Sequence, residues 1–202
     1  MISTLASISQ KAKIGKNNTI CQGVVIYDDV SIGDNNYISE YVVIGSPPES
    51  RTSGKKGQTV IGDNNVIREF VAIQAPYVRG ETRIGDNCYI MEKTHIAHDC
   101  QLGDNVTVSP GAVLGGTVTL CDNANIGINA SIHPRIKIER FCMIGMGANI
   151  TKPPKAFKTV VGLNKEVGWN IHGMNKSGCS VESIAKTCDM NVCDVVKYLK
   201  GR

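Results

Sequence analysis

The chain of 202 residues is long enough for one principal domain with a small appendage, and its hydrophobic content of 42% is ordinary for a protein that folds in water. It contains no run of about 18 apolar residues, which excludes a membrane-spanning helix, and its first residues lack the pattern of a signal peptide. We therefore expect a cytoplasmic protein. The eight cysteines form no C-x-x-C pair, which excludes a zinc ribbon and favours buried, reduced thiols.

The net charge of +4 is concentrated at the C-terminal end. Residues 151–202 hold nine Lys or Arg against four Asp or Glu, so the first 150 residues are nearly neutral. A basic end suits an acidic partner, although a solvated, lysine-rich surface is the commoner reason for such a composition.

An aliphatic residue recurs at every sixth position along most of the chain. The row runs over 8–44, resumes over 61–73 and continues without a miss over 84–150. A period of six fits neither an α-helix nor simple strand alternation, and it is typical of a β-helix in which each hexad supplies one short strand and one turn. The repeat therefore predicts a parallel β-helix over residues 1–151.

Turn triplets give the size of one coil. They begin at Gly85, Gly103 and Cys121, each 18 residues after the last, so three hexads form one triangular coil. We expect Gly and Asn to supply the corners, where a positive φ is needed.

Two insertions interrupt the row, over 45–60 and 74–83. A solenoid pushes extra residues outward as loops, usually onto its working face, although tolerated surface insertions give the same pattern. The first insertion carries Glu49 and Arg51, two candidates for a binding site.

The hexads stop after Thr151. For residues 152–202 we expect an irregular segment followed by two short helices, Val181–Cys188 with Ser180 as its N-cap and Val192–Leu199.

The stretch KTHIAHDC contains His95, His98 and Asp99. On an 18-residue coil Gly116 stacks on His98, and the next residue in that column lies beside His133. A histidine can act as a general base because imidazole titrates near neutral pH, and a glycine amide can stabilise the oxyanion of acyl transfer. Asp99 can orient His98 only if a turn replaces the strand here, since adjacent strand residues point to opposite faces.

Two other interpretations of this cluster remain. His95, His98 and Asp99 can supply metal ligands, or the histidines can be surface residues without a role. The stacked neighbours are glycine and proline, which offer no further ligand, so we favour a catalytic site without a metal.

Over nearly its whole length the chain resembles the UDP-N-acetylglucosamine O-acyltransferases that begin lipid A synthesis. The motifs that carry the resemblance are HIAHDCQLGDNV, GAVLGGTVTL, IGINASIHPRIKIERFCMIG and GWNIHGMNKSG, together with IGSPPES and IGDNNVIREFVAI. The resemblance implies a left-handed hexapeptide-repeat β-helix and a homotrimer.

The resemblance also implies roles for single residues. His98 corresponds to the general base, Asp99 to its partner and Gly116 to the oxyanion donor. His95 and His133 fall on positions that line the sugar and acyl site. The remaining contacts, to the nucleotide sugar and its phosphates, fall on Glu49, Arg51, Asn170 and Lys176.

The implied reaction moves an acyl group from a phosphopantetheine thioester, on acyl carrier protein or coenzyme A, to a hydroxyl of a UDP-N-acetylglucosamine-like nucleotide sugar. No bound cofactor is implied. The chain departs from the family pattern at Thr117, His172 and Ser177, where the family usually has a histidine, a carboxylate and a basic residue, and its C-terminal region is shorter. An N-acyltransferase for an amino-sugar nucleotide is the main alternative.

Two more distant alternatives belong to other functional classes. A non-catalytic β-helix scaffold explains the repeat but gives His98, Gly116 and His133 no purpose. A DNA-binding module built on the two C-terminal helices is the other, and we expect no nucleic acid partner because such short helices more often pack against protein.

Overall fold

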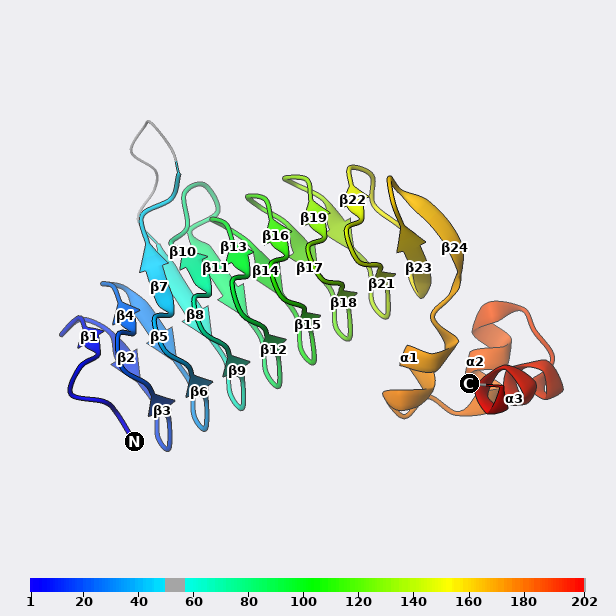
Figure 1. Cartoon of the computed structure of the whole chain (residues 1–202), viewed down its shortest axis with the longest axis horizontal. Coiled ribbons are helices and arrows are strands. Elements are labelled where there is room, and N and C mark those ends of the chain that lie inside the picture. Colours follow the sequence, from blue (N-terminus) through cyan, green and yellow to red (C-terminus); the bar gives the residue numbers. More distant parts are fainter. Residues whose placement is uncertain (50–56, 202) are drawn as a thin grey trace.

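The computed structural model describes residues 1–49 and 57–201, which form a triangular prism of short strands followed by helices (Figure 1). Within these residues the strands form three sheets, and consecutive strands over residues 7–161 belong to different sheets. Each coil therefore adds one strand to each face. The predicted parallel β-helix is confirmed.

The faces of the prism contain eight, seven and nine strands. The eight-stranded sheet has the order β1 (Ser7–Ile8), β4 (Val25–Ile26), β7 (Val43–Ser46), β10 (Ala72–Gln74), β13 (His95–Ile96), β16 (Val113–Leu114), β19 (Ser131–Ile132), β22 (Asn149–Ile150). The seven-stranded sheet has the order β2 (Lys13–Ile14), β5 (Val30–Ile32), β8 (Gln58–Ile61), β11 (Glu81–Ile84), β14 (Gln101–Leu102), β17 (Thr119–Leu120), β20 (Lys137–Ile138). The nine-stranded sheet has the order β3 (Thr19–Ile20), β6 (Tyr37–Ile38), β9 (Val66–Ile67), β12 (Tyr89–Ile90), β15 (Thr107–Val108), β18 (Asn125–Ile126), β21 (Met143–Ile144), β23 (Lys158–Val161), β24 (Lys165–Trp169).

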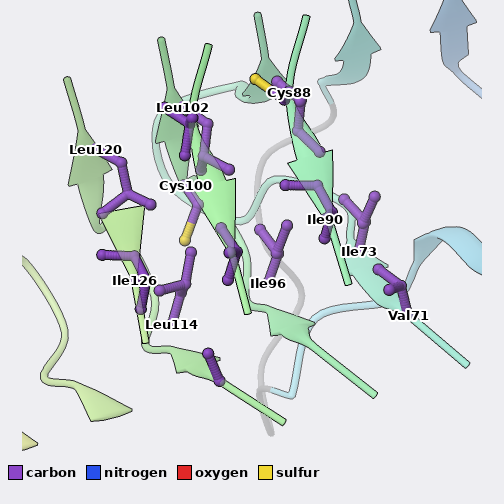
Figure 2. Packing of buried hydrophobic residues seen from close by; sticks show 14 of the residues in the cluster. Val71, Ile73, Cys88, Ile90, Ile96, Cys100, Leu102, Leu114, Leu120 and Ile126 are labelled. Atoms are coloured by element: carbon purple, nitrogen blue, oxygen red, sulfur yellow. The ribbon is translucent and has the colours of Figure 1, made fainter. Parts of the chain in front are cut away.

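The core consists of aliphatic rows that run along the inside of the prism. Ile44, Ile73 and Ile96 pair in register in the eight-stranded sheet, and all three are fully buried. Figure 2 shows part of this packing, including Val71, which is buried two positions before Ile73. Alternate strand residues point to opposite faces, so each hexad places two side chains inside. Each large aliphatic side chain buried this way stabilises the fold by about 1.5–3 kcal/mol.

The corners of the prism use Asn and Gly for different purposes. Asn35, Asn87 and Asn105 have φ values of 58°, 57° and 57°, in the left-handed region that Asn tolerates well. Gly85 and Gly103, which we expected to supply positive φ, lie outside that region. A Cβ on Gly85 would lie 2.7 Å from the carbonyl carbon of Gly103, so glycine is needed here for close stacking of the coils.

Four of the cysteines are buried, three are half-buried and one is exposed. Cys88, Cys100, Cys142 and Cys188 are buried, and all eight cysteines of the chain are free. Burial raises the pKa of the Cys88 and Cys100 thiols to about 12, so both are neutral at physiological pH. The prediction of buried thiols is confirmed for these four and wrong for Cys193, which is exposed.

The segment after Thr151 is more regular than we expected. β23 extends the nine-stranded sheet because Val160 pairs with Ile144 and is buried over the last coil. β24 then pairs antiparallel with β23, so this hairpin ends the parallel stack. Its residues lack the six-residue row, which is why the sequence did not predict it.

Three helices follow the hairpin, at the end of the prism where β24 leaves it (Figure 1). They are α1 (Ile171–Lys176), α2 (Val181–Cys188) and α3 (Val192–Lys200). The Ser180 hydroxyl accepts the N–H of Ser183, which confirms the predicted N-cap of α2. None of the helices in the described residues has the length and apolar character that a bilayer crossing needs.

A buried asparagine ladder joins the first coils. The Asn65 side chain accepts the Cys88 N–H at 2.7 Å and donates to the Gly85 carbonyl at 2.9 Å. The backbone N–H of Asn65 in turn donates to the side-chain oxygen of Asn36. Asn65 is fully buried, so water cannot replace these bonds.

We predict that Asn65→Ala lowers the free energy of unfolding by about 2–4 kcal/mol, because it leaves a buried N–H and a buried carbonyl without partners. Urea denaturation of the purified protein measures the change. Asn149→Ala is the matched control, since that side chain is exposed, and we expect a change within about 0.5 kcal/mol. Equal losses in the two variants would show that the ladder contributes nothing specific.

Candidate active site

His98 lies in the turn after β13, at the corner between the eight-stranded and seven-stranded sheets. Asp99 has a φ of 59°, so the chain turns between the two residues and their side chains meet. His98 Nδ1 lies 2.7 Å from Asp99 Oδ2. The turn that the sequence argument required for this pair is therefore present.

Asp99 is held by the second insertion. Its carboxylate, which has no solvent exposure, accepts three consecutive backbone N–H groups at 2.6–3.1 Å, those of Tyr77, Val78 and Arg79. Burial alone would raise the pKa of Asp99, but the hydrogen bonds from His98 and from these N–H groups outweigh burial and hold the pKa below its ordinary value. Asp99 is consequently a carboxylate at neutral pH.

An ionised Asp99 determines which nitrogen of His98 carries the proton. A carboxylate only accepts hydrogen bonds, so Nδ1 of a neutral His98 must be the donor and Nε2 keeps the lone pair. The ring edge that contains Nε2 lies against Gly116, because a Cβ built on that glycine would be 2.5 Å from both Nε2 and Cε1. Glycine at this position leaves the space that the imidazole occupies.

His98 and Gly116 border a pocket of about 450 Å³, which we call the corner pocket. The buried Gly116 has an N–H without a hydrogen-bond partner in the part of the chain that the structure describes. An amide donor can stabilise a tetrahedral oxyanion, and the imidazole lone pair beside it can accept a proton. The other residues of the lining are Tyr77, Val78, Arg79, Thr117, Pro134 and Arg135.

Two residues of the site were not found by sequence reasoning. The Gln74 side chain is buried, and its Oε1 accepts the His98 N–H at 3.2 Å. The Tyr77 ring contacts the imidazole edge-on, with centroids 5.5 Å apart. Both lie in the second insertion, whose conformation no repeat predicts. Gln74 is the last residue of the core strand β10 and Tyr77 follows three residues later, so the end of that strand was the available signal.

Thr117, in the lining of the corner pocket, has an unfavourable backbone conformation and, within residues 1–49 and 57–201, an unpaired hydroxyl. Its φ of 62° is unfavourable for a β-branched residue, and its hydroxyl is buried without a partner among the described residues. Strain of this kind is characteristic of functional positions. The sequence singled out Thr117 as a departure from the family pattern, and the structure places it next to Gly116 in the lining.

The other sequence-predicted residues lie outside the corner pocket. His95 is half-buried on the outer face of β13, and His133 is exposed with Nδ1 3.1 Å from the Pro134 carbonyl oxygen. Neither side chain borders the pocket. Glu49 is exposed in the first insertion. Arg51 lies outside the described residues.

Asn170 and Lys176 border a second cavity of about 920 Å³, between the nine-stranded sheet and α1. We call it the helix-side cavity, and its lining also includes Trp169 and His172. The Asn170 side chain is already engaged, because it accepts the N–H of Gly173 and donates to the Phe141 carbonyl. Asn170 therefore caps α1.

The described residues contain no cluster of three or more His, Cys, Asp or Glu side chains that could hold a metal ion. At the cluster where the sequence raised this possibility, Nδ1 of His98 and the Asp99 carboxylate are bound to each other. Their hydrogen bonds account for the geometry without a metal.

Comparisons with known proteins agree with this architecture. Residues 11–46 and 81–116 match the family described as bacterial transferase hexapeptide (six repeats). The acyl-acyl-carrier-protein–UDP-N-acetylglucosamine O-acyltransferase of Campylobacter concisus is 31% identical over 98% of this chain and 87% of its own length.

Two solved structures show the same fold. The UDP-N-acetylglucosamine acyltransferase from Campylobacter jejuni has a TM-score of 0.85 at 30% identity, covering 98% of this chain and 81% of that one. The enzyme from Bacteroides fragilis has a TM-score of 0.80 at 29% identity, covering 100% of this chain and 91% of that one.

By its hexapeptide repeats and its similarity to these enzymes over nearly its whole length, the protein is an acyltransferase. More particularly, the chain belongs to the family of UDP-N-acetylglucosamine O-acyltransferases. The resemblance inferred from the motifs is thereby confirmed.

We predict that Asp99→Asn lowers the free energy of unfolding by about 1–3 kcal/mol at pH 7. The pKa of Asp99 is lower in the folded than in the unfolded protein, so its ionisation stabilises the fold above about pH 4, and this contribution is lost as the pH falls through the folded-state value. The difference in free energy of unfolding between wild type and variant should therefore decrease in acid. Thermal unfolding between pH 7 and pH 3 measures it.

The matched control is Asp189→Asn, since Asp189 is exposed at the end of α2. We expect its free energy of unfolding to differ from that of the wild type by less than about 0.5 kcal/mol. If the loss in free energy of unfolding caused by Asp99→Asn stays constant as the pH falls, the prediction is contradicted.

Proposed function

We propose that the protein transfers an acyl group from a phosphopantetheine thioester to a hydroxyl of a UDP-N-acetylglucosamine-like nucleotide sugar. The observation that supports this most strongly is the His98–Asp99 pair beside the free N–H of Gly116 in the corner pocket. The name of the Campylobacter concisus relative supports acyl carrier protein as the donor and UDP-N-acetylglucosamine as the acceptor.

In the proposed mechanism, Nε2 of His98 takes the proton of the acceptor hydroxyl as its oxygen attacks the thioester carbonyl. The tetrahedral oxyanion accepts the N–H of Gly116. Asp99 stabilises the imidazolium that forms, since a buried carboxylate lies 2.7 Å from it. The intermediate then collapses, the C–S bond breaks, and the leaving thiolate receives the proton from His98.

The two cavities suggest how the acceptor is held. The corner pocket lies where the eight-stranded and seven-stranded sheets meet, whereas the helix-side cavity lies on the nine-stranded sheet, the face opposite that corner. Lys176 and His98 of one chain therefore border cavities on different sides of the prism. In our proposal, neighbouring prisms of a homotrimer bring Lys176 of one subunit to the corner pocket of the next.

We predict that His98→Ala lowers kcat by about 10² to 10⁴ and leaves nucleotide-sugar affinity nearly unchanged, because it removes proton transfer alone. His95→Ala should instead mainly weaken acceptor binding. Turnover is measured by mass spectrometry of the acylated sugar, and affinity by calorimetry. An added chelator should have no effect on activity.

Near-normal turnover of His98→Ala would show that another group is the base. The same product assay distinguishes the main alternative, because an ester is cleaved by mild alkali and an amide is not. An alkali-stable product would point to N-acylation of an amino-sugar nucleotide.

We predict that the protein is a homotrimer at micromolar concentration, since the two parts of the proposed acceptor site lie on opposite sides of one prism. Light scattering coupled to size exclusion measures the mass. A stable monomer with full activity would contradict the proposed shared site.

We predict that the apparent affinity for an acyl carrier protein donor falls with added salt. Lys186, Lys197 and Lys200 are exposed on the C-terminal helices and suit an acidic partner, and attraction between exposed charges is screened over about 8 Å at physiological ionic strength. The KM for the donor is measured at several salt concentrations. An unchanged KM, or a clear preference for coenzyme A thioesters, would overturn the choice of donor.

A further inference from the structure

Two arginines stand at the corner pocket. Arg79 comes from the second insertion and Arg135 from the turn after β19, and both are exposed residues of the lining. They lie far apart in the sequence but border the same space as His98. Arg79 lies outside the motifs that carry the family resemblance, and Arg135 lies within one of them but was given no role.

The backbone of each arginine is fixed by a residue of the proposed catalytic site. The N–H of Arg79 donates to Asp99 Oδ1 at 2.6 Å, and the N–H of Arg135 donates to the Gly116 carbonyl at 3.0 Å. Arg135 adopts a φ of 67°, in the left-handed region that a non-glycine residue enters at a cost. The backbone from which each guanidinium extends is therefore held beside the proposed catalytic residues.

Their positive charges are not balanced locally. Among residues 1–49 and 57–201 neither guanidinium lies within 4.0 Å of a carboxylate, and the lining of the pocket contains no acidic residue. Asp99, which the backbone N–H of Arg79 contacts, is buried and accepts bonds from His98 and from three backbone N–H groups. Glu81, two residues after Arg79, pairs with Arg83 instead. The pocket consequently presents two unpaired cations to whatever enters it.

We infer that Arg79 and Arg135 bind a phosphate group of a substrate while its reacting atoms lie at His98. Guanidinium groups bind phosphate through paired, charge-assisted hydrogen bonds, and two of them match a group that carries more than one acceptor oxygen. This inference rests on the proposed function, in which both substrates carry phosphate. The source is either the diphosphate of the nucleotide sugar or the phosphate of the phosphopantetheine arm.

The first test is direct binding. Calorimetric titration with inorganic pyrophosphate should show binding to the wild type, and Arg79→Gln and Arg135→Gln should each weaken it about 10-fold or more. Arg79→Lys and Arg135→Lys should recover part of the loss, since they restore the charge but not the paired geometry. Circular dichroism verifies that each variant is folded.

Arg83→Gln is the matched control. It removes the same charge from the adjacent strand β11, outside the pocket lining, and its pairing with Glu81 at 3.8 Å is solvent-exposed and therefore weak. We expect less than a 2-fold change in pyrophosphate affinity, about the effect of a distant screened charge. Equal losses in Arg83→Gln and the two pocket variants, or no loss in any of them, would overturn the inference.

The second test identifies the source of the phosphate. If the Gln variants raise KM for the nucleotide sugar, the site binds its diphosphate; if they raise KM for the thioester, the site binds the phosphopantetheine phosphate. An unchanged KM for both substrates overturns the inference. The pyrophosphate titration needs no acyl transfer, so it still decides the role of the arginines if the proposed reaction fails.

Discussion

The parallel backbone ladder between successive coils determines where every functional group of this protein lies. Its hydrogen bonds repeat in the same register, so a residue stacks on the residue one coil away and not on its neighbours in sequence. His98, Gly116 and Pro134 are three successive members of one corner column. The pocket is therefore a property of the stacking, and its imidazole and amide hold their separation because the core rows beneath them cannot slide without exposing aliphatic side chains.

The second insertion adds what the repeat alone cannot supply. Three N–H groups of this loop donate to the Asp99 carboxylate and so offset the free-energy cost of burying its charge. The ionised carboxylate in turn fixes the tautomer of His98. The loop is thus positioned by the residue that it stabilises. It also carries Tyr77 and Arg79 to the pocket, so one buried charge organises the orientation of the base, the wall of the pocket and part of its electrostatic field.

The sequence predicted the repeating part of the molecule well, because a six-residue row and an 18-residue coil leave few other structures. It therefore brought His98 and Gly116 together correctly. It did not predict Gln74 or the N–H groups around Asp99, since the path of an insertion depends on tertiary contacts. The sequence did not predict the hairpin of β23 and β24 for a similar reason, because Val160 covers the last coil without continuing the hexad row.

The two ends of the prism are finished differently. At the C-terminal end, the antiparallel hairpin covers the last coil, and Phe141, Phe157 and Trp169 pack against the buried core of the helices. At the other end Ile8 and Ile14 are only partly buried. In a solenoid each coil is stabilised by its neighbours, so opening should begin at the N-terminal coil and advance inward. Amide exchange should then form a gradient along the axis, and the paired strands β13 and β16 beside His98, several coils from that end, belong to the slowly exchanging interior.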